Sequence, residues 1–362
     1  IATERAARGG VLIKDRMALE SMRTVDTVLF DKTGTLTTGT PSVTEVEPVT
    51  GRTADEVLAL AAAAETDSEH PLARAIVRAA QARDLTVPAA VDFTSSPAVG
   101  VRATVDGRSV EVGGPNLLDD RHLPPLPVAA EWGRAGATVL HVLANGQVVG
   151  ALRLADEIRP ESREAVRALH AAGVAVVMIT GDAEPVAASV AAELGIDRVY
   201  AGVRPADKAA RVAELQHEGR TVAMVGDGVN DAPALAQADV GIAIGAGTDV
   251  AIGSAGVILA SDDPRSVLSV IELSQASYRK MQQNLWWAAG YNLLAVPLAA
   301  GVLAPVGFIL PMSVGAILMS ASTLVVALNA QLLRRLDLAP AASAAYFLDR
   351  PATERDRTPV AV

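Results

Sequence analysis

A long uncharged stretch most constrains how this chain can fold, because residues 281–333 contain no Asp, Glu, Lys or Arg. A bilayer is crossed by a helix of about 20 apolar residues, so this stretch has room for two membrane spans. Glycines and prolines cluster at residues 301–311, which places the turn there. Basic residues flank both ends of the stretch: Arg279, Lys280, Arg334 and Arg335. The positive-inside rule therefore predicts two transmembrane helices over 279–335 with both ends in the cytoplasm. A buried helical hairpin in a soluble protein is the alternative.

The composition agrees with membrane content. Half of the 362 residues are hydrophobic, 20% are charged, and the mean hydropathy is +0.30. The net charge of −10 argues against a nucleic-acid partner, whose phosphates attract basic proteins. The chain has no cysteine, which excludes disulfides and thiolate metal sites. It begins with Ile and no signal peptide follows, so we expect an N-terminal part to be missing.

Both ends of the chain carry weaker signals. Basic residues among apolar ones in residues 1–22 fit a helix leaving the membrane on its cytoplasmic side, although an ordinary amphipathic helix fits as well. Residues 336–362 are polar and rich in Ala and Pro, which predicts a disordered tail.

The chemistry of the chain centres on Asp31. The apolar run 27–30 predicts a buried strand, and Asp31 follows it at the start of a Gly/Thr-rich turn. In open α/β sheets, ligands bind at this end of the strands. A carboxylate there can attack a phosphoryl group and hold it as an acyl-phosphate. Lys32 and the amides of the turn can face phosphate oxygens. An isolated Asp in a turn is more commonly a turn or capping residue. Whether Asp31 is a nucleophile therefore depends on the motifs in the rest of the chain.

From residue 149 onward, strands and helices alternate. We predict strands at 174–179, 199–201, 221–225 and 240–244, and helices at 159–172, 185–194, 207–218 and 232–238. Alternation of this kind indicates an α/β fold with a doubly wound parallel sheet. The sheet domain is expected to comprise residues 23–44 and 149–278.

Residues 45–148 are predicted to form an inserted α+β domain. Thr53 and Glu56 make a capping box for a helix over 53–66, and Pro71 starts a second helix over 71–83. Strands are predicted at 99–105, 109–112, 138–143 and 147–152. Asp-Gly at 106–107 and Asn-Gly at 145–146 are hairpin turn signals between them.

Three further motifs lie at predicted strand ends. Thr180-Gly181-Asp182 follows the strand 174–179, Lys208 lies on the next crossover, and residues 226–231, Gly-Asp-Gly-Val-Asn-Asp, follow the strand 221–225. The carboxyl ends of parallel strands share one edge of a sheet, so these groups can converge on Asp31. They supply a hydroxyl and a cation for phosphate, and carboxylates for Mg²⁺, which phosphoryl transfer needs.

Residues 31–37, Asp-Lys-Thr-Gly-Thr-Leu-Thr, match the phosphorylation motif of P-type ATPases. Together the motifs resemble the haloacid-dehalogenase-like phosphorylation domain of that family. The resemblance implies that Asp31 is the phosphorylated residue. The residues it implies are Asp31, Thr33, Thr180 and Lys208 for catalysis; Asp31, Thr33, Asp227 and Asp231 for Mg²⁺; and Gly181, Asp182 and Asn230 for ordering the site and the bound nucleotide.

Thr33 separates two activities of this fold. Phosphatases of the superfamily usually carry a second Asp two residues after the nucleophile, where it acts as general acid and base. Thr33 cannot do that work. We therefore expect a phosphoenzyme that persists until another domain positions a water molecule.

Residues 68–72, Ser-Glu-His-Pro-Leu, resemble the nucleotide-domain motif of the heavy-metal branch, class IB. The resemblance implies that His70 packs near the adenine of ATP and that Glu65 contacts it. Gly100 and Gly113 are further candidates, although Ala98 replaces the first glycine of a Gly-x-Gly turn and Gly114 replaces the Asn of a Gly-Asn pair. A capping or surface role is the alternative for His70.

Polar residues inside the uncharged stretch are functional suspects, although they can also serve only to join helices. Gly290-Tyr291-Asn292, and residues 319–323, Met-Ser-Ala-Ser-Thr, resemble the last two helices of copper and silver ATPases. The resemblance implies that Tyr291, Asn292, Met319 and Ser322 contact the transported metal. A thioether suits Cu(I) or Ag(I), with Cu(II) as an alternative. The Asp usual in the last span of the zinc branch is absent.

The implied function is ATP-driven export of copper or silver across a cell membrane, with Mg²⁺ as cofactor and the catalytic domains in the cytoplasm. The chain would be the C-terminal half of a multi-pass pump. The actuator domain, the first six membrane helices and the metal-binding Cys-Pro-x loop would belong to the missing half. Three alternatives stay open: a pump for another divalent or transition metal, a phosphatase of the same fold, and a regulatory fragment that only binds nucleotide.

Overall fold

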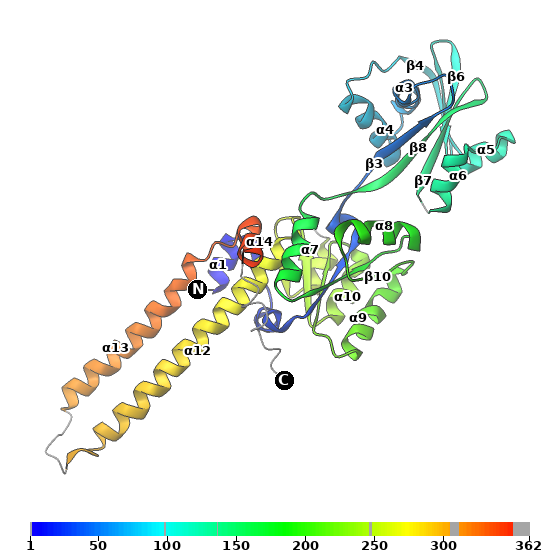
Figure 1. Ribbon diagram of the computed structural model, residues 1–362. Coiled ribbons are helices and arrows are strands. Elements are labelled where there is room, and N and C mark those ends of the chain that lie inside the picture. Colours follow the sequence, from blue (N-terminus) through cyan, green and yellow to red (C-terminus); the bar gives the residue numbers. More distant parts are fainter. Residues whose placement is uncertain (1, 98, 136, 246–247, 305–310, 350–362) are drawn as a thin grey trace. The chain divides into compact units, whose positions relative to one another are not determined.

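The computed structural model describes residues 2–97, 99–135, 137–245, 248–304 and 311–349. The chain forms two compact units (Figure 1). The first contains the residues up to Asp31, Glu161–Met178 and the residues from Arg204 onward. The second contains Lys32–Pro160 and Ile179–Val203.

A largely parallel sheet forms the core of the first unit. Its strands run in the order β1 (Val11–Ile13), β13 (Val257–Leu259), β12 (Val240–Ile244), β11 (Val222–Gly226), β2 (Thr27–Asp31) and β9 (Ala175–Ile179). The pairs β2–β11, β11–β12 and β12–β13 are parallel, and β1 is antiparallel to β13. Every residue of β2, β11 and β12 is buried, as expected for parallel strands covered on both faces. This confirms the predicted α/β class.

Short amphipathic helices cover this sheet. They are α2 (Arg16–Ser21), α7 (Ser162–Ala171), α9 (Lys208–His217), α10 (Ala232–Gln237) and α11 (Asp249–Ser254). In α7, the buried positions Ala165, Val166 and Leu169 recur at the spacing of one helix face. The predicted strands and helices after residue 149 are thus present, and their ends lie within a few residues of the expected ones.

The N-terminal segment differs from the prediction of one helix over 1–22. Helix α1 (Ala2–Arg8) ends before Gly9 and Gly10, and Gly10 has a positive φ of 76°. The chain then enters β1, where Val11 lies opposite Leu259. Two glycines in succession break the helix, and the short apolar run that follows pairs with a sheet edge instead.

Two long helices follow the sheet, α12 (Ser266–Ala299) and α13 (Met312–Gln331), and they lie side by side (Figure 1). The first part of α12, from Ser266 to Ala276, is buried in the first unit. Within the described residues, one segment is long and apolar enough to cross a membrane, Ser313–Arg335, with a mean hydropathy of 1.8. The predicted turn at 301–311 falls partly on residues 305–310, which lie outside the described part.

The predicted disorder of residues 336–362 is wrong for 340–348. Helix α14 (Pro340–Leu348) begins with Pro in its first turn and buries Ser343, Ala344 and Phe347. It packs against α7 and α12, and Leu338 just before it is also fully buried. The apolar residues of this short segment therefore find partners that its composition did not reveal. Residues 350–362 lie outside the described part.

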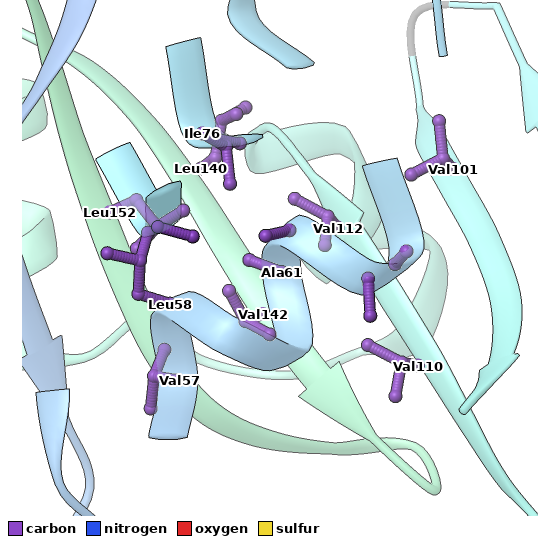
Figure 2. Close-up of a cluster of buried hydrophobic side chains, with 14 of the residues drawn as sticks. Val57, Leu58, Ala61, Ile76, Val101, Val110, Val112, Leu140, Val142 and Leu152 are labelled. Carbon is purple, nitrogen blue, oxygen red and sulfur yellow. The ribbon is translucent and has the colours of Figure 1, made fainter. Parts of the chain in front are cut away.

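The second unit contains an antiparallel sheet in the order β3 (Thr37–Pro48), β8 (Gln147–Ile158), β7 (Thr138–Ala144), β6 (Arg108–Gly113), β5 (Gly100–Val105) and β4 (Ala90–Ser96). Helices α3 (Ala54–Glu65) and α4 (Pro71–Ala82) pack on one face. Figure 2 shows Val57, Leu58 and Ala61 of α3 against strand residues such as Val112 and Val142.

The other face of this sheet carries α5 (Pro115–Arg121) and α6 (Pro127–Arg134). Val139 packs with Trp132 of α6, and Leu143 packs with Leu117 of α5. The unit also contains α8 (Glu184–Leu194) and β10 (Arg198–Tyr200). Strands β3 and β8 pair from Thr37–Ile158 to Pro48–Gly150, so the predicted limits of 45 and 148 for the inserted domain are too narrow.

The capping box and the two hairpin turns predicted in the second unit are present. Thr53 and Glu56 form the predicted capping box of α3. Asp106 and Gly107, like Asn145 and Gly146, all have positive φ, as two-residue hairpin turns of type I′ require. Strands β3 and β4 and helices α5 and α6 were not predicted.

Docking of α14 can be tested by removing its main buried ring. Phe347 is fully buried and its ring meets that of Tyr346 edge to face at 5.1 Å. Phe347→Ala should lower the free energy of unfolding by about 3–5 kcal/mol, because a buried aromatic side chain leaves a cavity. Ala345→Ser, at an exposed position of the same helix, should change it little. Urea unfolding followed by circular dichroism measures both, and equal midpoints would contradict the docked position.

Candidate active site

Asp31 lies where the sequence places it, at the carboxyl end of β2. Phe30 is paired in parallel with Val225 of β11, so Asp31 comes beside the residues that follow β11. Asp31 is 6% exposed. Lys208, the first residue of α9, places its Nζ 2.5 Å from Oδ1 of Asp31 and 2.7 Å from Oδ1 of Asp231. One ammonium therefore bridges two carboxylates from distant parts of the chain.

Asp231 is held on both of its oxygens. Its Oδ1 accepts from Lys208, and its Oδ2 accepts from the backbone N–H of Gly228 at 3.1 Å. The carboxylate lies against Gly226, where an added Cβ would approach Oδ2 to 2.7 Å. The glycine at the end of β11 thus leaves the space in which Asp231 can reach Lys208.

The third carboxylate is Asp227. Ligand oxygens of Asp31, Asp227 and Asp231 all lie within 4.8 Å of one another. Such carboxylate oxygens are the ligands that Mg²⁺ prefers. With one ammonium among three carboxylates, the cluster carries excess negative charge that a divalent cation would balance.

Burial is the main influence on the protonation of Asp31. Burial first, and then repulsion from Asp231, raise the pKa of Asp31 to about 7, although the Lys208 ammonium opposes both. Burial also disfavours the charged form of Lys208, but the attraction of Asp31 and Asp231 outweighs it and raises the Lys208 pKa. Lys208 therefore stays a cation at neutral pH.

Thr33, Thr180, Gly181 and Asp182, also predicted for phosphoryl transfer, belong to the second unit. Thr33 is exposed in the turn η2 (Lys32–Leu36). Thr180 is 2% exposed, and its hydroxyl oxygen accepts from the backbone N–H of Asp182 at 3.1 Å. Gly181 lies between them, with Val203 O 3.6 Å from the place of a Cβ. In the first unit, Asn230 is exposed on the short turn η4 (Val229–Asp231).

Lys32, which the sequence predicts can face phosphate oxygens, pairs with two carboxylates of the second unit. It is 5% exposed, and its Nζ lies 2.8 Å from Oδ2 of Asp182 and 3.5 Å from Oδ2 of Asp156. Arg159 donates to the carbonyl oxygen of Gly34 at 3.1 Å. These contacts fix the turn after Asp31 within the second unit. The sequence analysis did not identify Asp156 and Arg159 as residues that position this turn. Their location, where the chain returns from the inserted domain, could have indicated it.

In the nucleotide domain, Glu65 and His70 have different surroundings. Glu65 ends α3 and is 6% exposed, and burial raises its pKa to about 7 against a lowering hydrogen bond with Ser68. His70 is exposed and caps α4, its Nδ1 accepting from the backbone N–H of Leu72 at 3.2 Å. The capping alternative for His70 is thus the geometry present here.

The candidate glycines pair with each other. Gly100 of β5 lies opposite Gly113 of β6. A Cβ on Gly100 would come 2.1 Å from Val112 O, and a Cβ on Gly113 would come 2.1 Å from Val99 O. Close approach of the two strands alone therefore requires glycine at both positions. Gly114 has no such restriction, and Ala98 lies outside the described residues.

The four residues expected at the transported metal divide into two pairs. Tyr291 of α12 and Ser322 of α13 are partly buried. Asn292 and Met319 are exposed, and Met319 is 63% exposed.

Comparison with known proteins supports the predicted family. Residues 25–239 match the model of the haloacid dehalogenase-like hydrolases. The catalytic domain of the CPx-ATPase CopB-B is 32% identical, with a TM-score of 0.58 over 74% of this chain and 98% of that one. This chain belongs to the haloacid dehalogenase-like hydrolases and, within them, to the P-type ATPases. The crystal structure of a zinc-transporting PIB-type ATPase is similar over a longer stretch, with 38% identity and a TM-score of 0.82 over 92% of this P-type ATPase chain and 53% of that one.

Curated relatives of this P-type ATPase chain point the same way. The copper-exporting P-type ATPase B of Archaeoglobus fulgidus is 49% identical over 92% of this chain and 48% of the relative. The probable copper-exporting P-type ATPase V of Mycobacterium tuberculosis is 50% identical over 84% of this chain and 40% of the relative. The chain thus spans about half the length of the curated relatives that it matches.

The raised pKa of Glu65 has a consequence for stability. The folded protein holds this proton more tightly than the unfolded chain between pH 4.5 and 7, so the Glu65 contribution to stability falls as pH rises through that window. Glu65→Gln should therefore stabilise the chain at pH 8, on the order of 3 kcal/mol, and much less at pH 5. Thermal unfolding of both proteins at the two pH values measures the difference, and a pH-independent difference would contradict a buried carboxyl that titrates near 7.

Proposed function

We propose that this chain is the catalytic C-terminal half of a pump that uses ATP to export a transition metal, copper before others, through a phosphorylated Asp31. The observation that carries the proposal is the buried Asp31 carboxylate, bridged through Lys208 to Asp231 with Asp227 nearby. Burying so many charges together is costly for stability. A site that binds and transfers a phosphoryl group needs these charges, which explains why the protein keeps them despite that cost.

In this reaction an Asp31 oxygen attacks the γ-phosphorus of ATP, the new O–P bond forms, and the bond to ADP breaks. The Lys208 ammonium offsets the negative charge of Asp31 and of the incoming phosphoryl group. Asp227 and Asp31 are the proposed Mg²⁺ ligands with the carbonyl of Thr33, and bound Mg²⁺ would neutralise phosphate oxygens. Asp231, expected among these ligands, has both oxygens engaged by Lys208 and Gly228, which favours a positioning role. Thr180, Gly181, Asp182 and Asn230 stay proposals for phosphate and nucleotide binding.

ATP recognition is assigned to the second unit. Glu65 is the strongest candidate, since a carboxyl with a pKa of about 7 can donate or accept a hydrogen bond at an adenine edge near neutral pH. His70 is exposed beside the start of α4 and is available for the adenine face. Gly100 and Gly113 would allow a nucleotide to approach the backbone of β5 and β6.

Copper is favoured by two observations. The relatives with 49% and 50% identity are named as copper exporters, whereas the zinc-transporting structures are 37% and 38% identical. Residues 281–333 offer the Met319 thioether and no carboxylate, and thioethers suit Cu(I) or Ag(I). A pump for Cu(II) or for another metal remains the alternative within the family. The exposed α13 and the shared family support a cell-membrane location, with an N-terminal half that completes the pump.

The nucleophile can be tested by one substitution. Asp31→Asn should abolish acid-stable label from γ-labelled ATP, because an amide cannot form the acyl-phosphate, and ATP binding should persist. Asp84→Asn is the matched control, since Asp84 lies in an exposed turn with a positive φ that Asn also tolerates. Gel autoradiography after acid quench measures both, and undiminished label on the Asp31 variant would place the nucleophile elsewhere. Absence of label on the unmodified chain would favour the nucleotide-binding alternative.

The phosphorylated chain should decay slowly by itself. Thr33 supplies no general base, and the domain that positions water in the family is expected in the other half. Phosphate release over many minutes should stay near one equivalent per chain, with or without Cu(I). Sustained multiple turnover by this chain alone would favour the phosphatase alternative.

A further inference from the structure

Four polar side chains join α12 and α13 at the start of the uncharged stretch. Asn329 of α13 donates through Nδ2 to Oδ1 of Asn284 at 2.8 Å and to Oε1 of Gln283 at 3.4 Å. Lys280 donates through Nζ to Oδ1 of Asn329 at 3.0 Å and to Oε1 of Gln283 at 3.1 Å. We name Lys280, Gln283, Asn284 and Asn329 the polar clamp.

The clamp uses both ends of the Asn329 amide. Its three partners on α12 stand at positions i, i+3 and i+4, so they share one face of that helix. They lie shortly after the buried part of α12, which ends at Ala276. Beyond Ala276 the positions of α12 are partly buried or exposed, and polar groups that meet in an apolar environment gain from pairing with each other.

Beyond the clamp, the two helices share a narrow seam. Along α12 from Asn284 to its end, the partly buried positions are Asn284, Ala288, Tyr291, Ala295 and Leu298. Their spacing alternates between four and three residues, which is the pattern of a helix that packs against one neighbour.

The facing helix shows the matching pattern. Partly buried positions of α13 include Gly315, Ser322, Val326 and Asn329. The helices form a hairpin and so run in opposite directions (Figure 1). Tyr291 is seven residues after Asn284, and Ser322 is seven residues before Asn329. The register that pairs Asn284 with Asn329 therefore brings Tyr291 to the level of Ser322.

We propose that the polar clamp sets the register of α12 against α13, so that Tyr291 and Ser322 share the seam while Asn292 and Met319 stay outside it. The second part rests on the proposed function, because it assigns Asn292 and Met319, rather than the seam pair, to contacts with the other half of the pump. The first part concerns this chain alone.

The small and apolar positions of the seam cannot fix the register by themselves. Ala288, Ala295, Val326 and Gly315 are small or apolar, and a shift of one helical turn would exchange one such contact for another. The clamp is different, because a one-turn shift would separate Asn329 from Asn284 and leave amides unpaired. A single polar residue at a helix seam is known to specify register in this way.

The chain has no cysteine, so disulfide formation between introduced pairs reports the register directly. Ala288→Cys with Val326→Cys joins positions at the same level, and Ala288→Cys with Ser322→Cys joins positions about one turn apart. In the full chain in lipid vesicles, oxidation should favour the first pair. Asn329→Leu should lower the ratio of the first disulfide to the second by about 3- to 30-fold, which corresponds to the usual 0.6–2 kcal/mol of an interhelical hydrogen bond.

Two further variants keep this test decisive. Thr323→Val also removes a polar group from α13, but the Thr323 hydroxyl donates only to Met319 O of its own helix among the described contacts, so the ratio should not change. Asn284→Asp keeps an acceptor for Asn329 and should preserve the ratio. An unchanged ratio in Asn329→Leu, or an equal loss in Thr323→Val, would overturn the proposal.

The complete pump separates this proposal from the proposed function. If the clamp positions the metal residues, Asn329→Leu should raise the Cu(I) concentration for half-maximal ATPase activity while Thr323→Val leaves it unchanged. An unaltered concentration together with an altered disulfide ratio would overturn the part about Asn292 and Met319. A pump without copper stimulation would refute the proposed function, and the disulfide ratio would still decide whether the clamp sets the register.

Discussion

The bridge from Lys208 to Asp31 and Asp231 is the interaction on which the site depends. Three carboxylates meet at the ends of β2 and β11, and burial raises the pKa of Asp31. A nucleophile has to be ionised, and Lys208 is the cation that opposes this tendency at Asp31. Lys208 is separated from Asp31 by 177 positions and from Asp231 by 23, so only the parallel order of the sheet brings the three together. The parallel order of the strands therefore positions the three side chains that form this ion bridge.

The parts of the site that follow a strand directly could be predicted from the sequence. Asp31, Thr180 and Asp227 each come immediately after an apolar run, or one residue later, and the strand predicts their position. The partner of a charged side chain could not be predicted in the same way. Lys32 was expected near phosphate because of its place after Asp31, yet it pairs with Asp182 and Asp156. Which carboxylates pair with Lys32 depends on how β8 runs beside β3, and no local sequence pattern predicts that pairing.

The ends of the chain show where composition misleads. Residues 336–362 were predicted to be disordered from their overall composition, but Leu338 and Phe347 are fully buried because α7 and α12 provide apolar surfaces. Likewise β1 has only three residues, too few for a periodicity, and exists because β13 offers an edge. In both cases tertiary partners outweigh a weak local preference. Long, strongly patterned elements such as α3 and α4 were predicted correctly because their own residues suffice.

In the hairpin of α12 and α13, some features were evident from the sequence and others were not. Its apolar length was evident, but the sequence did not show which of its polar residues pair with each other. The structure separates those that satisfy each other, in the polar clamp, from those that do not face the neighbouring helix. If α12 crosses a membrane, as the sequence predicts, the exposed Asn292 needs a partner or a ligand, because an unpaired amide in hydrocarbon costs free energy. Under the proposed function, the part of the pump outside this chain would supply that partner, since the chain spans about half the length of its curated relatives. With the register fixed as we propose, Asn292 and Met319 lie outside the seam, where such a partner can reach them.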